Sequence, residues 1–127
     1  MTTFKPGDIL LAMLVFTDGS ATKKRPVLGM SGEKYNQARD EIVVTAISSN
    51  TTRKLFGEIR IKAWKKAGLL YPSIMTGIFF TIRKEFVEKR IGCLQAEDWT
   101  GMKKVTEQVL EPAAPAKKKR RVTKKDD

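Results

Sequence analysis

Three adjacent cations, Lys23, Lys24 and Arg25, stand directly before the apolar run 26–28, with no spacer between them. The preceding run 17–20, Thr-Asp-Gly-Ser, is typical of a turn. An arginine fixed at the start of a strand can bind two oxygens of one oxyanion through its planar guanidinium. The pattern therefore has two interpretations. Arg25 is a clamp for an oxyanion, flanked by two looser cations, or the cations are the solvated part of a loop.

The charge of the chain favours a polyanionic partner. The 127 residues carry a net charge of +11 with a pI near 10.0. Residues 1–110 hold 18 cations and 11 acids, and residues 111–127 hold seven cations and three acids, so both parts are basic. Such a balance points to nucleic acid or an anionic membrane surface. We expect no membrane span and no secretory leader, which indicates a cytoplasmic protein.

The absence of histidine excludes several kinds of active site. Ser-His-Asp and Cys-His catalysis and histidine-ligated metal centres need a residue that this chain does not contain. The single cysteine, Cys93, can form neither an internal disulfide nor a C-x-x-C zinc motif. We expect Cys93 to be a small buried hydrophobic residue in a reducing compartment. The sequence thus predicts a protein without a metal or cofactor.

Short strands and one closing helix dominate the predicted secondary structure. Apolar runs and alternation predict strands, and the spacing of Trp99, Met102, Val105 and Val109 along one face predicts a helix over Gln95–Leu110. A second short helix is expected near Ala63–Ala67. The fold class is therefore mainly β, a small barrel with a C-terminal helix. The strands are predicted at Asp8–Phe16, Pro26–Ser31, Glu41–Ile47, Gly57–Lys62, Ile74–Ile82 and Arg90–Leu94.

The last seventeen residues differ from the rest. Pro112 and Pro115 open a run in which Val122 is the only residue of the basic stretch that could help a core. We predict a domain at 1–110 and a disordered Lys/Arg-rich tail at 111–127. The run KKKRRV at 117–122 could also be taken for a nuclear-import signal, but a solvated tail is the simpler interpretation.

Four blocks of the chain, in order, resemble the MazF/PemK toxin family. They are GDILLAMLVFTDGSATKKRPVLGMS at 7–31, VVTAISSN at 43–50, GLLYPS at 68–73 and FTIRKEFVEKRIGCLQAEDW at 80–99. The resemblance implies an SH3-like barrel, usually a homodimer. It implies the toxin of a type II toxin–antitoxin pair, whose partners are single-stranded RNA such as mRNA and a cognate antitoxin. The implied activity is endoribonuclease cleavage without metal, leaving a 2′,3′-cyclic phosphate and a 5′-OH.

The resemblance also assigns residues. Arg25 matches the family's catalytic arginine in its Arg-Pro pair, and Ser48 falls where the family has a hydroxyl residue, commonly threonine. The oxyanion at Arg25 would then be a scissile phosphate, attacked by the neighbouring 2′-OH. The sequence departs from the family after the Pro-Ser element, because Ile74–Ile78 carries no charge where the family often has an arginine or aspartate.

Other residues complete the predicted site. A guanidinium stays protonated near neutral pH, so Arg25 would stabilise charge and not act as the base. Asp18 is a candidate base or an ordinary turn aspartate. The predicted RNA contacts are Thr17, Lys23, Lys24, Ser49 and Asn50, although Ser49 and Asn50 could instead cap a strand end. Trp64 and Tyr71 could stack on bases, but core packing is the expected use of Trp64.

A competing function comes from another class. SH3-like barrels also serve as non-catalytic nucleic-acid-binding modules, and a basic barrel with a basic tail would suit that role without cutting RNA. Incubating the protein with labelled single-stranded RNA, with and without a chelator, separates the two.

Overall fold

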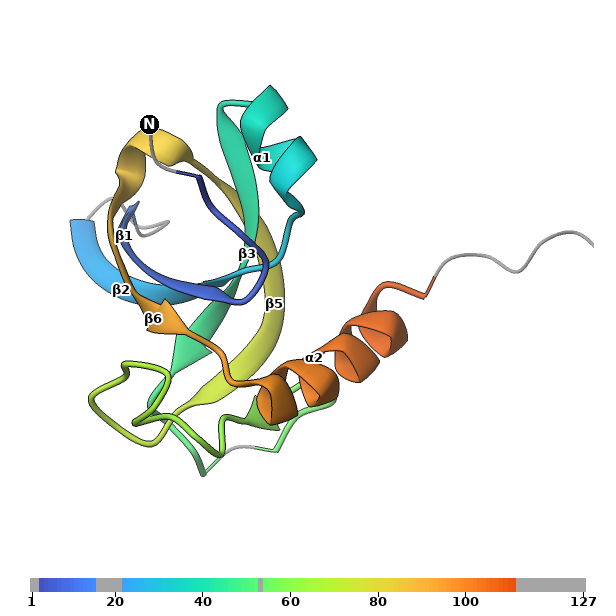
Figure 1. Cartoon of the computed structure of the whole chain (residues 1–127). Helices are drawn as coiled ribbons and strands as arrows, with labels where there is room; N and C mark the ends of the chain where they lie inside the picture. Colours follow the sequence, from blue (N-terminus) through green and yellow to red (C-terminus); the bar gives the residue numbers. More distant parts are fainter. Residues whose placement is uncertain (1–2, 16–21, 53, 112–127) are drawn as a thin grey trace, which may run out of the picture.

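The structure is a computed structural model that describes residues 3–15, 22–52 and 54–111. Six strands form one antiparallel sheet in the order β4-β5-β3-β2-β1-β6. Figure 1 shows the sheet curling round on itself, with the C-terminal helix α2 lying beneath it. In chain order the elements are β1 (Asp8–Val15), β2 (Thr22–Gly29), α1 (Glu33–Ala38), β3 (Glu41–Ser48), β4 (Ile59–Arg60), β5 (Ile74–Arg83), the 3-10 turn η1 (Lys84–Phe86), β6 (Val87–Cys93) and α2 (Ala96–Val109).

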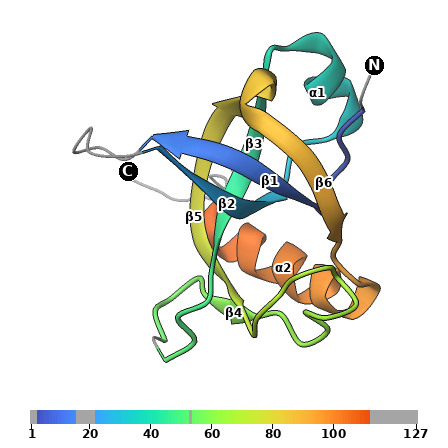
Figure 2. The ribbon, with the colours of Figure 1, turned by 90° about the vertical axis from the view of Figure 1, so that its left-hand side faces the viewer.

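The mainly β fold with a C-terminal helix is confirmed, but the barrel is not closed. β4 and β6 are the two edges of the sheet, and within the described residues they do not pair with each other. α2 runs across the end of the curled sheet next to β4 (Figure 2). The helix packs against one apolar cluster of the sheet, through Met102 and Trp99.

Two apolar clusters lie on the two faces of the central strands. Ile9 and Leu28 belong to a cluster that includes Met102 of α2. Their neighbours Leu10 and Val27 belong to a second cluster. Successive side chains of a strand point to opposite faces, so β1 and β2 are covered on both sides. This explains why β1 and the 26–28 part of β2 are apolar runs in the sequence, whereas the first half of β2 is charged and exposed.

α2 confirms the predicted helix, with Gln95 and Leu110 as its caps. Met102 is fully buried, and Trp99 packs against the same core cluster. Gly101 has a reason in the packing: a Cβ added there would lie 2.8 Å from Cδ1 of Ile59 in β4. The glycine lets the helix approach the sheet edge more closely than alanine would.

Several local predictions were wrong. Residues 62–68 form turns and not a helix; the last of them, Gly68, has a φ of 98°. α1 was not predicted; its Asn36 is buried, and the Asn36 amide donates to the Phe4 and Ser31 carbonyls, each at 3.0 Å. Cys93 is exposed at the end of β6, so it is not a core residue.

β2 begins at Thr22, four residues earlier than predicted. The three cations therefore lie inside the strand and not in front of it. Pro26 is also inside β2, opposite Leu11 of β1, and pairing with β3 starts only at Val27. At Pro26 the strand has no β3 residue opposite it, so the missing N–H breaks no ladder on that side. Arg25 is therefore held by pairing with β1, whereas on the β3 side this part of β2 has no partner strand.

Candidate functional site

A pocket of about 760 Å³ opens where β2, β3 and β6 meet the segment between β4 and β5. Its lining combines cations, small polar groups and apolar side chains. Among the described residues that line it, three are cationic and none is acidic. The lining residues are Leu11, Arg25, Pro26, Ile47, Ser48, Ser49, Asn50, Gly68, Leu69, Leu70, Tyr71, Ser73, Lys89, Arg90 and Ile91.

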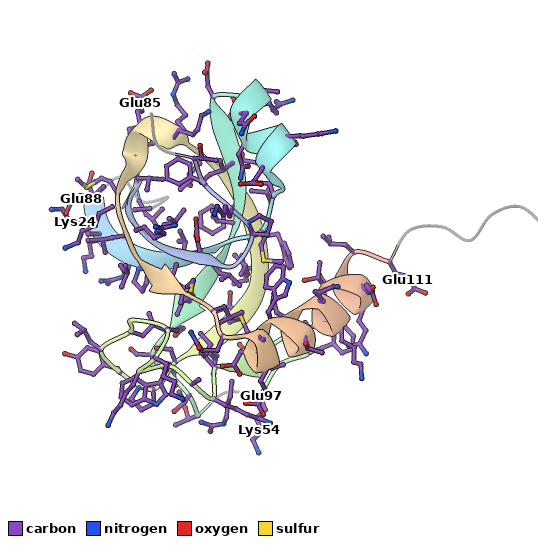
Figure 3. The ribbon with its side chains drawn as sticks, viewed as in Figure 1. Lys24, Lys54, Glu85, Glu88, Glu97 and Glu111 are labelled. Atoms are coloured by element: carbon purple, nitrogen blue, oxygen red, sulfur yellow. The ribbon has the colours of Figure 1, made fainter. Side chains whose placement is uncertain are left out.

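β2 contributes the arginine predicted from the sequence. Arg25 is exposed, lies opposite Ala12 of β1 and lines the pocket. Lys23 and Lys24 lie on the same strand but do not belong to the lining. The Lys24 ammonium is paired with the carboxylate of Glu88 on β6, as Figure 3 shows. Of the three adjacent cations, Arg25 is thus the one in the pocket.

The end of β3 brings the predicted polar residues to the same place. Ser48, Ser49 and Asn50 all line the pocket. The Ser48 hydroxyl accepts a hydrogen bond from the Asn50 backbone N–H at 3.1 Å. The Asn50 side-chain oxygen accepts from the N–H of Thr52 at 3.2 Å and from its hydroxyl at 2.7 Å. Asn50 therefore shapes the turn after the strand, while Ser48 and Ser49 stand at the pocket wall.

The opposite wall is formed by the segment that leads into β5. Leu70 and Tyr71 are 82% and 64% exposed, and both line the pocket. Tyr71 is thus available for stacking, as predicted. Trp64 is not in the lining; it packs against the core, with the Lys65 ammonium 5.5 Å from the centre of its ring.

Two contacts hold this segment in place. The buried carboxylate of Asp98 in α2 accepts the backbone N–H groups of Lys62 and Ala63, each at 2.9 Å. Gly92 of β6 lies so close to the segment that a Cβ there would be 2.1 Å from the Ala67 carbonyl oxygen. The wall that carries Leu70 and Tyr71 is therefore fixed to both α2 and β6.

β6 supplies two cations that sequence reasoning missed. Lys89, Arg90 and Ile91 all line the pocket, although three successive residues of a regular strand cannot share one face. The pairing of β1 with β6 skips Ile91 between Leu10–Arg90 and Ile9–Gly92, and it skips Glu88 between Ala12–Val87 and Leu11–Lys89; such shifts mark β-bulges. The run Glu88-Lys89-Arg90 was visible in the sequence, but the bulges were not.

The uncharged run Ile74–Ile78 lies inside β5. Its Ile74, Met75 and Thr76 are buried, and none of the three lines the pocket. The positive charge of the pocket comes from β2 and β6 instead. The predicted residues Thr17 and Asp18 lie outside the described residues, as does the tail from residue 112 onwards.

In the described part of the chain, no three His, Cys, Asp or Glu side chains gather where they could hold a metal ion. No helix in that part is long and apolar enough to cross a membrane.

This arrangement is chemically suited to a phosphodiester with an attached base. Guanidinium and ammonium groups bind phosphate oxygens, hydroxyl groups orient them, and an exposed aromatic ring beside them can stack on a base. A family model for the PemK-like, MazF-like toxin of type II toxin–antitoxin systems matches residues 5–110. The chain belongs to this toxin family. A search of curated proteins by sequence finds no match.

Solved structures share the fold. The chain is 25% identical to the Mycobacterium tuberculosis toxin MazF-mt6, with a TM-score of 0.67 over 84% of this chain and 99% of that one. An endoribonuclease in complex with its cognate antitoxin, from a mycobacterial species, is 13% identical, with a TM-score of 0.71 over 88% and 99%. MazF in a MazE–MazF complex from Deinococcus radiodurans is 14% identical, with a TM-score of 0.68 over 89% and 100%.

Proposed function

We propose that this protein is a metal-independent endoribonuclease that cleaves single-stranded RNA as the toxin of a type II toxin–antitoxin pair. The observation that carries the proposal is the basic pocket, in which Arg25 of β2 and Ser48 of β3 line one cavity. Membership of the toxin family and the similarity to solved proteins named as endoribonucleases support it.

The proposed reaction is an internal transesterification. The ribose 2′-oxygen attacks the adjacent phosphorus, the bond from phosphorus to the 5′-oxygen breaks, and the products are a 2′,3′-cyclic phosphate and a 5′-OH. Negative charge develops on the non-bridging oxygens, where Arg25 would bind two of them through its fork of donors. The Ser48 hydroxyl would orient the phosphate or the 2′-OH. Asp18 stays a candidate for the base that removes the 2′-OH proton, and the departing 5′-oxygen would take up a proton from the protonated base or from water.

Two macromolecular partners belong to this proposal. A cognate antitoxin would neutralise the toxin, in keeping with the antitoxin complexes among the structurally similar proteins. A second copy of the chain would form a homodimer, as predicted from the family resemblance. Size measurement by light scattering, alone and with the co-expressed antitoxin, tests both.

The decisive experiment is cleavage of a labelled single-stranded RNA in EDTA. We expect cleavage to persist, and the new ends to be a cyclic phosphate and a 5′-OH. Arg25→Lys keeps the charge but loses the bidentate fork, so cleavage should fall at least about a hundredfold while RNA binding changes much less. Arg83→Lys, which changes an exposed arginine outside the pocket, is the matched control.

Two results would overturn the proposal. Loss of activity in EDTA with recovery in magnesium would show a metal-dependent enzyme. Tight RNA binding with no cleavage under any condition would favour the non-catalytic binding module.

A further inference from the structure

We propose that Arg90 is a second phosphate-binding residue of the pocket and that the buried Asp8 is the positioning residue that fixes it. The inference rests on the proposed RNA-binding function of the pocket. It concerns residues that neither the sequence motifs nor the family match singled out.

Asp8 is a buried carboxylate whose partners the structure identifies. It lies at the start of β1, and its side chain is only 6% exposed. Its Oδ2 accepts the backbone N–H of Lys5 at 2.9 Å, and its Oδ1 lies 3.5 Å from Nη1 of Arg90. A carboxylate removed from water needs such partners, because its desolvation is otherwise uncompensated. The buried Asp8 carboxylate therefore favours a position of the Arg90 guanidinium within ion-pair distance of it.

Arg90 lines the pocket and lies next to a bulge in β6. Its side chain is 55% exposed and lines the same cavity as Arg25. A guanidinium has five N–H donors in a fixed plane, and the contact with Asp8 involves one of its nitrogens, Nη1. Among the described residues, the structure gives Arg90 no further hydrogen-bond or ion-pair partner. Donors thus remain to bind an anion while Asp8 holds the group.

This arrangement differs from an ordinary surface ion pair. The Lys24–Glu88 pair joins two side chains that are 50% and 41% exposed, so solvent screens both. In the Asp8–Arg90 pair the acid is buried and the base faces the cavity. One partner is therefore a fixed support, and the other is free to contact a ligand.

The probe is a fluorescent, mixed-sequence, single-stranded 2′-O-methyl RNA, which cannot be cleaved by 2′-OH attack. Binding is measured by anisotropy as a function of salt for the full chain and each variant. Arg90→Gln should weaken binding on the order of tenfold at low salt and lower the salt slope by about 0.7, the value for one phosphate contact on a single strand. Arg90→Lys should keep the slope but not the full affinity, because the fork is lost.

Asp8→Asn gives the sharper test. It removes a negative charge beside a basic pocket, so Coulomb attraction alone predicts tighter RNA binding. Positioning predicts the reverse, with weaker binding because Arg90 is no longer held. In an Arg90→Gln background, Asp8→Asn should no longer weaken RNA binding, because the arginine that Asp8 positions is absent and the two substitutions are then not additive. Thermal unfolding of each variant shows whether the fold is kept.

Arg83→Gln is the matched control for the arginine. Its Nε lies 2.7 Å from Glu85 Oε1, and this hydrogen bond together with the charge of Glu85 raises the pKa of the Arg83 guanidinium. Arg83 is paired with an acid like Arg90, but it does not line the pocket. We expect Arg83→Gln to change RNA binding much less than Arg90→Gln.

Three outcomes would overturn the inference. Arg90→Gln could bind like the parent protein, or like Arg83→Gln. A folded Asp8→Asn could bind more tightly, with the same effect in both backgrounds.

The results also separate this inference from the cleavage proposal. If the parent fails to cut RNA but the variants behave as expected in binding, the cleavage proposal is wrong and this inference stands. If Arg25→Lys abolishes cleavage while every Arg90 variant binds RNA like the parent, the cleavage proposal stands and the inference on Arg90 is wrong.

Discussion

Asp98→Asn should loosen one wall of the pocket and destabilise the protein measurably. Asp98 lies in the first turn of α2 and is 4% exposed. Its two oxygens each accept a backbone N–H of the segment before β5, at 2.9 Å. Asparagine keeps one acceptor and presents an NH₂ to the other N–H. One charge-assisted hydrogen bond is thus replaced by two donors that face each other.

The magnitude follows from these contacts. Losing one hydrogen bond to a charged group costs about 1.5–3 kcal/mol. For a domain of this size, 1 kcal/mol corresponds to about 4 °C in Tm, so a fall of roughly 6–12 °C is expected. The segment also carries Leu70 and Tyr71, and a displacement of the wall by about 1 Å could lower RNA cleavage by as much as a hundredfold.

Glu97→Gln is the matched control. Glu97 is the neighbouring acid in the same turn of α2, and it is exposed (Figure 3). Both substitutions remove one negative charge from a helix N-terminus, where the macrodipole makes an acid worth about 0.3–1 kcal/mol. The control should therefore lower Tm by no more than about 4 °C.

The assays are differential scanning calorimetry and RNA cleavage on both variants. If the two lower Tm equally, the helix dipole explains the effect and the hydrogen bonds to the segment contribute nothing. If Asp98→Asn lowers Tm but leaves cleavage at the parent rate, the segment does not position the pocket wall.

Three further predictions concern the same region and the tail. Gly92→Ala would place a Cβ 2.1 Å from the Ala67 carbonyl oxygen, so it should destabilise the fold by about 1–3 kcal/mol in a urea titration. Gly32→Ala has open space around it and changes only the N-cap of the short helix α1, so it should cost about 1 kcal/mol or less. Ser48→Ala should reduce RNA cleavage about tenfold or more with a Tm change of at most a few degrees, and Ser48→Thr should restore activity because the hydroxyl returns; equal rates for all three would remove Ser48 from the mechanism. Deleting residues 111–127 should leave Tm nearly unchanged and make the salt dependence of RNA binding shallower by about 0.7 for each lost phosphate contact, with the same cleavage sites, because phosphate contacts carry no sequence information. An unchanged slope would show that the tail does not touch RNA.

Local patterns in the sequence were sufficient for much of the fold. The apolar run after Pro6-Gly7 predicted Asp8–Phe16, and the strand is Asp8–Val15. The spacing of Trp99, Met102, Val105 and Val109 predicted the helix, which spans Ala96–Val109. These elements bury whole faces, so the period of their apolar residues reflects the structure directly.

Short elements held by distant contacts could not be predicted in this way. α1 has no apolar stripe. The side-chain amide of its buried Asn36 donates a hydrogen bond to the backbone carbonyl of Phe4, 32 residues away. Residues 63–67 resemble a helix locally, but they form turns between Asp98 and Gly92, which come from α2 and β6. In both places tertiary contacts decide the backbone conformation, and local propensity does not.

The candidate site, like the fold, could be predicted from the sequence only in part. The sequence by itself determined the basic charge, the absence of histidine chemistry, and the presence of Arg25 and Ser48 in recognisable motifs. Only the tertiary structure decided which cations share the pocket: Lys24 pairs with Glu88, whereas Arg90 enters the cavity beside Arg25. A physical reason lies in the irregular pairing of β6, which breaks the two-residue alternation that a strand sequence implies, so that Lys89, Arg90 and Ile91 all line the pocket. Pairing register is a property of two strands together, so neither strand's sequence alone reveals it.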